Sequence, residues 1–265
     1  MRRNLLRQRF AEGRPIVNAW LAIPSAYSAE VIGHQGFDSV TVDLQHGMIG
    51  FDAAVPMLQA LSSTPAVPLA RVSKCDYALV MQLLDAGAYG IICPMISTPA
   101  QAREFASFCR YPPGGGQRSF GPARGLLYGG ADYFAHADAE ILALPMIETR
   151  EAVANVDAIL ATPGIDGIYI GPNDLCLSHD CAPAPEPADA AMAGLIRDLA
   201  AAAGRAGKMA GIFCSGGEAA KGRVGDGFHM VTPGNDVALL SRASKAAVAA
   251  VRGEGAAAPT SKTGY

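Results

Sequence analysis

The feature that most constrains this chain is a repeated alternation of short apolar runs with helical patterns. Eight such runs predict eight strands, at residues 16–23, 37–46, 67–72, 89–96, 141–148, 167–174, 208–214 and 228–233. A strictly alternating βα series predicts a parallel sheet with helical cover. At eight units the sheet is expected to close into a (β/α)8 TIM barrel. The alternative is an open doubly wound sheet, but no GxGxxG motif follows the first run.

Helix signals separate these runs. Residues 3–12 predict a short N-terminal helix, and Ser25 is expected to be the N-cap of the helix that ends near residue 33. Further helices are expected to begin near residues 50, 76, 98, 149, 187, 217 and 236. Two segments are too rich in glycine or proline for regular structure, namely 111–138 and 176–188. The arginines of the first, Arg118 and Arg124, favour a functional loop.

Length and charge limit the organisation of the chain and its partners. We expect one barrel domain over residues 1–252 and a flexible, low-complexity tail over 253–265. The net charge of −3 and the pI near 5.9 argue against nucleic-acid or anionic-membrane partners. No window approaches the ~18 apolar residues of a membrane span, and no secretory leader is evident, so a cytoplasmic protein is expected.

Four chemically active side chains fall at the ends of the predicted strands. His46, Arg71, Glu148 and Asp174 each follow or end an apolar run. In a (β/α)8 barrel the reacting groups collect at the C-terminal ends of the strands. The sequence therefore predicts an active site in which a histidine, an arginine and two carboxylates converge.

Each of these residues also has an alternative role. Glu148 and Asp174 suit a hard divalent cation such as Mg²⁺ or Mn²⁺, although Glu148 alone would also serve near a helix N-terminus. His46 is expected to be a general base, the alternative being a core histidine with satisfied nitrogens. Arg71 needs an anionic partner, which a substrate oxygen or a protein carboxylate would provide.

These groups together indicate enolate chemistry. A cation and Arg71 would stabilise a developing oxyanion while His46 moves the proton. The turn Gly171-Pro-Asn-Asp174 offers backbone N–H groups for a substrate carboxylate. A Schiff-base mechanism is disfavoured, because Lys74 lies beyond its strand and Lys208 begins one.

Several motifs resemble one known family over residues 20–242. They are Asp43-Leu-Gln-His-Gly47, Pro68-Leu-Ala-Arg71, Gln82-Leu-Leu-Asp-Ala-Gly87, Arg110-Tyr-Pro-Pro113, Ile147-Glu-Thr-Arg150 and Ile170-Gly-Pro-Asn-Asp-Leu175. In order and spacing they are similar to the HpcH/HpaI aldolases, the metal-dependent pyruvate aldolases of aromatic-acid and sugar-acid catabolism. The resemblance implies reversible cleavage of a 4-hydroxy-2-oxo acid into pyruvate or hydroxypyruvate and an aldehyde.

The resemblance also implies roles for individual residues. Glu148 and Asp174 would be ligands of Mg²⁺, Mn²⁺ or Co²⁺, Arg71 would stabilise the enolate, and His46 would be the base, acting largely through water. Asp85 matches an aspartate that pairs with the histidine. The turn Gly171, Pro172, Asn173 and Asp174 would bind the keto-acid carboxylate. Trp20 and Phe213 would line the aldehyde pocket. Members assemble as hexamers, trimers of dimers that exchange the C-terminal helix.

Some residues depart from the family pattern. Met146 replaces a glutamine two residues before the metal-binding glutamate, and Gln45 replaces a glutamate before the histidine. With Asp43, Arg118 and Arg124, they are candidates for support around the metal and substrate. Two other functions remain open: a CoA-thioester lyase of the malyl-CoA or citryl-CoA kind, and a non-catalytic keto-acid-binding protein.

Overall fold

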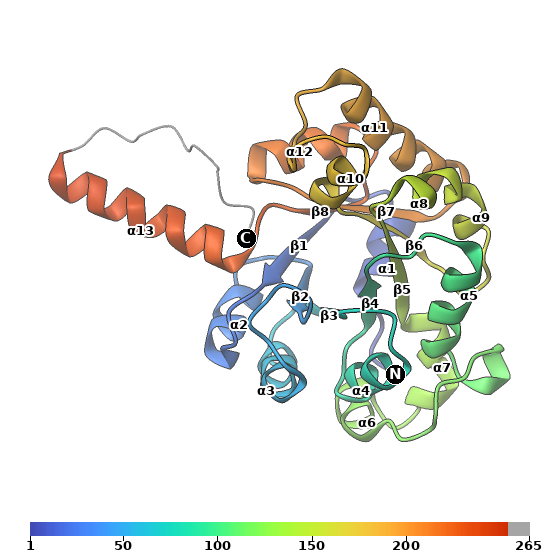
Figure 1. Ribbon diagram of the computed structural model, residues 1–265. Helices are drawn as coiled ribbons and strands as arrows, with labels where there is room; N and C mark the ends of the chain where they lie inside the picture. The colour runs from blue at the N-terminus through green and yellow to red at the C-terminus, as the bar shows by residue number, and fades with distance from the viewer. Residues whose placement is uncertain (254–265) are drawn as a thin grey trace.

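A closed parallel barrel forms the centre of the computed structural model, which describes residues 1–253. The strands pair in chain order, and β8 returns to β1 (Figure 1). This confirms the predicted (β/α)8 barrel. The strands are β1 (Ile16–Leu21), β2 (Ser39–Asp43), β3 (Val67–Arg71), β4 (Gly90–Cys93), β5 (Leu142–Ile147), β6 (Gly167–Ile170), β7 (Met209–Phe213) and β8 (Met230–Thr232).

The helices cover the outside of the barrel, as Figure 1 shows. Their starts follow the sequence signals: the side chains of Ser25, Asp76, Thr98 and Thr149 all cap helix N-termini, and Thr98 forms a full capping box. The helices of the first half are α1 (Leu5–Ala11), α2 (Ala26–Gly33), α3 (Phe51–Leu61), α4 (Tyr77–Asp85), α5 (Pro99–Phe108), α6 (Ala123–Gly129) and α7 (Tyr133–Glu140). Those of the second half are α8 (Arg150–Ala154), α9 (Val156–Leu160), α10 (Pro172–Ser178), α11 (Ala190–Arg205), α12 (Gly217–Gly225) and α13 (Asp236–Arg252).

Two segments predicted to be irregular contain helices instead. The segment 111–138 holds a 3-10 turn, η1 (Pro112–Gly114), then α6 and the start of α7. Its glycines and prolines lie mostly before α6, where they shape the turn, and the apolar residues after Pro122 form a helix. The irregular segment expected from Cys176 begins only after α10, and the single helix predicted over 149–160 is interrupted at Asn155.

The apolar core has two layers because successive residues of a strand point to opposite faces. Inside the barrel lie the side chains of Trp20, Leu69, Leu144, Tyr169 and related residues. A larger apolar layer lies between the strands and the surrounding helices. The short strands therefore read as continuous apolar runs, as expected for a parallel sheet that is covered on both faces.

A buried polar cluster crosses the barrel interior. Asn18 on β1 donates from Nδ2 to the Thr232 hydroxyl at 2.9 Å, and its Oδ1 accepts from Ser39 at 2.7 Å and from Thr41 at 3.1 Å. The Thr232 hydroxyl also lies 2.7 Å from the Tyr169 hydroxyl. Since each of these polar groups is paired, the cluster joins β1, β2, β6 and β8 without leaving a buried donor unsatisfied.

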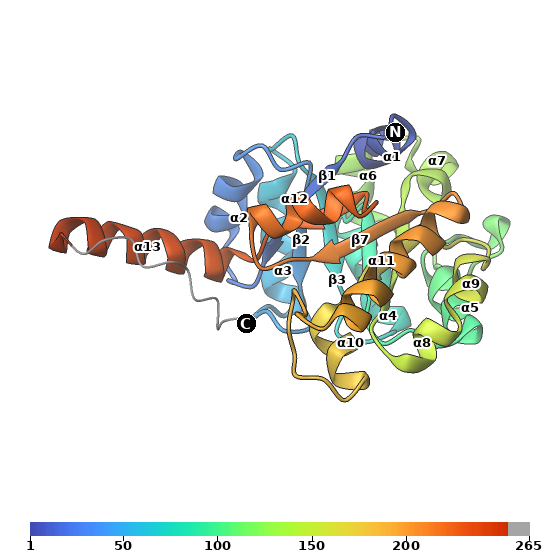
Figure 2. The ribbon, with the colours of Figure 1, turned by 90° about the horizontal axis from the view of Figure 1, so that it is seen from above.

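The last helix, α13, extends away from the barrel in both views (Figures 1 and 2). Asp236 is its one buried residue. The Asp236 carboxylate accepts the backbone N–H groups of Ala22 and Ile23, which fixes the start of α13 against the end of β1. Most of the tail predicted to be flexible, residues 254–265, lies outside the described residues. None of the described helices is both long and apolar enough to cross a membrane.

Replacing Asn18 with Ala tests the buried polar cluster. The change leaves the hydroxyls of Ser39, Thr41 and Thr232 with fewer partners, so the free energy of unfolding should fall by about 3 kcal/mol. Urea unfolding, followed by circular dichroism, measures it. Ser63→Ala, at an exposed position, is the control and should change the unfolding free energy by less than about 0.5 kcal/mol. Equal stability of Asn18→Ala and wild type would contradict the role of the cluster.

Candidate active site

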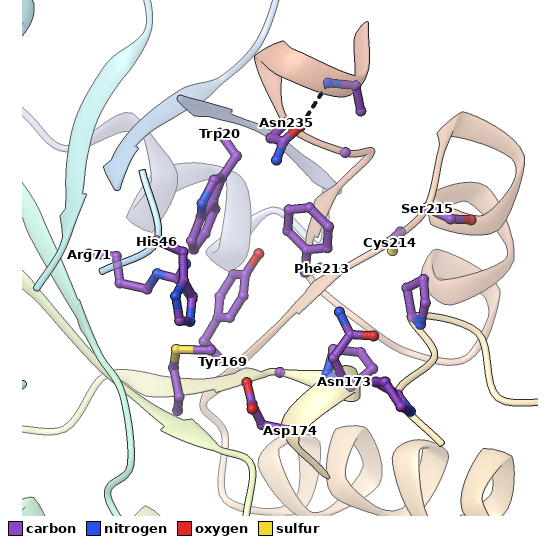
Figure 3. A pocket seen from close by; sticks show the side chains of 17 residues that line it. Trp20, His46, Arg71, Tyr169, Asn173, Asp174, Phe213, Cys214, Ser215 and Asn235 are labelled. Atoms are coloured by element: carbon purple, nitrogen blue, oxygen red, sulfur yellow. Dashed lines mark hydrogen bonds between the residues drawn. The ribbon is translucent and has the colours of Figure 1, made fainter. Parts of the chain in front are cut away.

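A cavity of about 770 Å³ opens at the C-terminal ends of the strands. His46, Arg71, Asp174 and Asn173 line it together with the aromatic rings of Trp20, Tyr169 and Phe213 (Figure 3). These residues come from β1, β3, β6, β7, the loop after β2 and the first turn of α10. Of the four residues predicted to converge, His46, Arg71 and Asp174 line the cavity, and Glu148 lies beside it, next to the lining residue Gly171. They meet because the C-terminal ends of parallel strands lie at one face of a barrel.

Arg71 is held by Asp43 inside the barrel. Its Nε and Nη2 donate to the two carboxylate oxygens of Asp43 at 2.7 and 2.6 Å, and both residues are buried. Burial acts to raise the pKa of Asp43, but the hydrogen bonds and charge of Arg71 hold that pKa below its usual range. Of the two partners foreseen for Arg71, the protein carboxylate is thus present, while the guanidinium group still lines the cavity.

Trp20 completes this arrangement. Its indole Nε1 donates to Asp43 Oδ2 at 3.2 Å, and the Arg71 guanidinium lies 4.8 Å from the centre of its ring. The ring of Tyr169 lies 5.4 Å from that of Trp20, and the Tyr169 hydroxyl belongs to the buried polar cluster. A cation over an aromatic face is attracted to it, so Trp20 and Asp43 together fix where Arg71 points.

His46 lies in a loop, because the second strand ends three residues earlier than predicted. β2 ends at Asp43, and His46 follows in the loop, where its side chain is exposed to the cavity. The Asp43 carboxylate shapes this loop by accepting the backbone N–H groups of Gln45 at 3.0 Å and of His46 at 3.4 Å. The Oε1 atom of Gln45, at the position where the family pattern has a glutamate, is buried without a hydrogen-bond partner.

Glu148 directly follows β5 and is 2 % exposed. Its Oε1 accepts the backbone N–H of Met95 at 2.7 Å, and its Oε2 faces Gly171, where an added Cβ would lie 2.5 Å away. Burial and, to a smaller extent, the negative charge of Asp174 raise the pKa of Glu148 to about 7, although the Met95 hydrogen bond and the charge of Arg71 act to lower it. Thr149, and not Glu148, caps the following helix.

The carboxylates of Glu148 and Asp174 form an acidic pair that could hold a divalent cation. Asp174 lies in the first turn of α10, four residues past the end of β6, rather than on the strand. No cluster of three or more metal-ligating side chains occurs among residues 1–253. Two carboxylates, with water and substrate oxygens in the other positions, are a common ligand set for Mg²⁺ and Mn²⁺. The residues present therefore fit a hard divalent cation.

Besides Asp43, Gln45 and Glu148, which lie behind the lining, three more residues implied or suspected from the sequence do not line the cavity of the single chain. Asp85 ends α4 and binds Arg118 at 2.7 Å; burial raises the pKa of Asp85, which Arg118 partly offsets. Arg118 also stacks over Tyr111. Arg124 donates to the carbonyl of Ala86 at 2.6 Å. The arginines of segment 111–138 thus hold that segment to α4.

Several cavity residues were missed by the sequence analysis. Met146, the position of a family departure, lines the cavity as suspected, but Tyr169 and the loops after β7 and β8 were not predicted. The missed residues are Cys214, Ser215, Gly234 and Asn235 of these loops, Ala238 in the first turn of α13, and Pro183 and Pro185 from the segment after α10. Their position after strand ends was the available signal, since loops at that end of a barrel build its site.

Comparison with known proteins identifies the family. The HpcH/HpaI aldolase/citrate lyase profile matches residues 17–243. The chain belongs to this family. A hydroxypyruvate/pyruvate aldolase of Rhizorhabdus wittichii is 43% identical over 249 residues, which cover 94% of this chain and 99% of the relative.

Other HpcH/HpaI relatives match the chain over a similar length. A 4-hydroxy-2-oxo-heptane-1,7-dioate aldolase of Salmonella arizonae is 34% identical and covers 93% of this chain and 94% of its own length. The crystal structure of a family member from Burkholderia cenocepacia superposes with a TM-score of 0.86 at 30% identity, covering 94% of this chain and 99% of that one. The sequence resemblance to this family is therefore confirmed.

The buried Glu148 should weaken folding at neutral pH in metal-free protein. Its folded-state pKa is about 7, above its ordinary value near 4.5, so the folded state binds more protons, and stability is lost as the pH rises through 7. Glu148→Gln cannot ionise and keeps an oxygen for Met95. In EDTA it should be about 2 kcal/mol more stable than wild type at pH 8 and nearly equal to it at pH 4.5. Urea unfolding at both pH values measures this.

The control for this prediction is Glu151→Gln, an exposed carboxylate in the first turn of α8. Its effect should not depend on pH in the same way. A Glu148→Gln variant whose stability follows that of wild type at both pH values would show that burial does not penalise the Glu148 charge.

Proposed function

We propose that this chain is a carbon–carbon lyase that reversibly cleaves a 4-hydroxy-2-oxo acid into pyruvate or hydroxypyruvate and an aldehyde. The observation that carries the proposal is the convergence of His46, Arg71 and Asp174 on one cavity. Asp43 binds Arg71 from behind, and Glu148 lies beside the cavity-lining Gly171 and close enough to Asp174 to feel its charge. The names of the relatives support it, since those reported above are aldolases of pyruvate, hydroxypyruvate or a 4-hydroxy-2-oxo acid.

Glu148 and Asp174 would hold the divalent cation, with Mg²⁺, Mn²⁺ and Co²⁺ as the candidates. When bound, it would supply Lewis-acid stabilisation of the negative charge that develops on the 2-oxo oxygen. The proposal is supported by the chemistry of the pair: two neighbouring carboxylates, one of them almost fully buried, carry more negative charge than the nearby Arg71 neutralises, because Arg71 is already bound to Asp43.

The remaining roles follow from where the side chains lie. Arg71, oriented by Asp43 and Trp20, would stabilise the enolate and carbonyl oxygens. His46 lines the cavity and would take the proton from the 4-hydroxyl group during cleavage, directly or through water. The backbone of the turn Gly171–Asp174 would bind the keto-acid carboxylate, and Trp20 and Phe213 would contact the aldehyde.

Removal of the carboxylates tests the proposal. Glu148→Ala and Asp174→Ala should each lower kcat/KM by at least about 10³-fold in cleavage of a 4-hydroxy-2-oxo acid, and no added metal should restore it. Both should also stop exchange of the pyruvate methyl protons in D₂O, followed by NMR. Glu151→Ala, outside the cavity, is the control. Full activity of EDTA-stripped enzyme, with no metal restored, would contradict the metal role.

The same exchange measurement separates the other functions left open by the sequence. A non-catalytic keto-acid-binding protein would bind pyruvate without exchanging its methyl protons. A CoA-thioester lyase would act on an acyl-CoA and would show saturable binding of CoA. Exchange that needs metal, combined with release of an aldehyde from a 4-hydroxy-2-oxo acid, is expected of the aldolase alone.

We further propose that the chain assembles as a hexamer, a trimer of dimers that exchange α13. The support is the exposed surface of this helix: Val237, Leu240, Val248 and Val251 are all exposed, as is Val17 on β1. Apolar residues on a projecting helix are typical of a subunit interface.

The assembly is tested by measuring mass in solution. Wild type should have the mass of six chains by light scattering, whereas Leu240→Asp should dissociate at micromolar concentration because it places a charge in the interface. Lys245→Glu, exposed on the same helix, is the control for a change of charge alone. A monomeric wild type would contradict the proposal.

A further inference from the structure

We propose that the end of the cavity farther from Arg71 selects uncharged aldehydes, and that the carboxylate of Glu186 imposes this selection. The inference rests on the proposed aldolase function and specifies the class of its acceptor. It concerns the wall formed by the segment Cys181–Ala188, which joins α10 to α11. Pro183 and Pro185 of this wall line the cavity.

The wall is held in place by a small number of interactions. The Glu186 carboxylate accepts the backbone N–H of Ser215 at 2.9 Å, which ties the wall to the loop after β7. On its other side, the Cys176 thiol donates to the carbonyl of Ala184 at 3.7 Å. The prolines at 183, 185 and 187 restrict the backbone between these points. The wall is therefore a fixed surface that a substrate meets, and the Glu186 carboxylate lies where it joins Ser215, a residue that also lines the cavity.

Phe213, Ser215 and Asn235, which line the cavity together with the wall, are apolar or neutral. Phe213 packs edge-on against Trp20 at 5.8 Å, and beside it lie Ser215 and Asn235 (Figure 3). Among the described residues that line the cavity, those with a basic side chain are His46 and Arg71, which lie together on the Trp20 side in Figure 3. This end can hold an alkyl chain or a hydroxylated carbon by contact and neutral hydrogen bonds.

An anionic group would be disfavoured at this end for two reasons. The Ser215 N–H, which would otherwise be a donor for an anion, already binds Glu186. The negative charge of Glu186 would also repel a second carboxylate or a phosphate nearby. At several ångströms and intermediate dielectric, such repulsion corresponds to a discrimination of roughly fivefold in kcat/KM.

Arg242 is a cation that approaches this loop, and its Nη2 would lie 3.4 Å from a Cβ added to Gly234, which lines the cavity. Its Nη1 donates to the Ser215 carbonyl at 3.4 Å, and its side chain is exposed and is not part of the cavity lining. Ser215 is thus held at its N–H by Glu186 and at its carbonyl by Arg242. Because the Arg242 guanidinium is exposed to solvent and bound to the Ser215 carbonyl, its charge is screened, and a variant without it tests whether it also acts on the aldehyde.

The test compares two aldehydes of the same chain length, butanal and succinic semialdehyde, with pyruvate as donor and the metal-loaded enzyme. Wild type should use butanal with a kcat/KM about fivefold or more above that for succinic semialdehyde. Glu186→Gln keeps an oxygen for the Ser215 N–H and removes the charge. It should raise kcat/KM for succinic semialdehyde about fivefold and leave that for butanal within about twofold.

Two further measurements separate charge from structure. The discrimination in wild type should shrink as KCl rises from 0.02 to 0.5 M, because salt screens a partly exposed carboxylate (Debye length falling from about 20 to 4 Å). Asp198→Asn, which removes an exposed charge on the outside of α11, should not change the ratio of the two aldehydes. Arg242→Gln should likewise leave the ratio within about twofold.

The outcomes distinguish this inference from the proposed function. The donor half-reaction, exchange of the pyruvate methyl protons, does not involve the aldehyde and should be equal in wild type and Glu186→Gln. Absence of exchange in wild type would contradict the aldolase function itself. Normal exchange with equal use of both aldehydes, an unchanged ratio in Glu186→Gln, or a selective loss of succinic semialdehyde activity in Arg242→Gln would overturn the role of Glu186 alone.

Discussion

The ion pair between Asp43 and Arg71 is the interaction on which the rest of the site depends. It joins the ends of two neighbouring strands, β2 and β3, on which Asp43 and Arg71 lie directly opposite each other in the sheet register. Asp43 also accepts the Trp20 indole and two backbone N–H groups of the loop that carries His46. One buried carboxylate therefore sets the positions of the guanidinium, the aromatic wall and the histidine loop. A buried ion pair of this kind is retained for the geometry that it fixes, since its net contribution to stability is small.

The acidic pair, Glu148 and Asp174, lacks the charge neutralisation that Asp43 and Arg71 give each other. Glu148 is buried with a single backbone hydrogen bond and a second carboxylate nearby, so folding alone disfavours its charged form. Arg71 and Asp43 neutralise each other, whereas Glu148 and Asp174 do not. One half of the site is thus an ion pair whose charges cancel, and the other half is a pair of carboxylates whose negative charge a cation would neutralise. This division agrees with the enolate chemistry proposed for the family fold, in which charge develops between the two halves.

The sequence was sufficient to predict the barrel because its signals are local. Apolar runs of strand length alternate with capped helices such as those that begin after Ser25 and Thr98, and parallel topology then brings the strand ends together. The sequence did not reveal that α6 and α7 follow Pro122, because the preceding glycines and prolines dominate that segment. Nor did it reveal that Tyr169 and Ser215 line the cavity, or that Arg118 binds Asp85, since these contacts depend on how distant loops pack.

The barrel closes where its main-chain pairing is short. β8 has three residues, and β1 and β8 are matched through two residue pairs, Ile16 with Met230 and Val17 with Val231. Directly above this seam, Asn18 reaches Thr232 through its side chain, and Thr232 in turn meets Tyr169. Side-chain hydrogen bonds between β1 and β8 thus add to the few backbone pairs that join these two strands. The Tyr169 ring lines the cavity while its hydroxyl meets Thr232, so a substitution of Tyr169 that reshapes the cavity also removes a side-chain contact at the closure of the barrel.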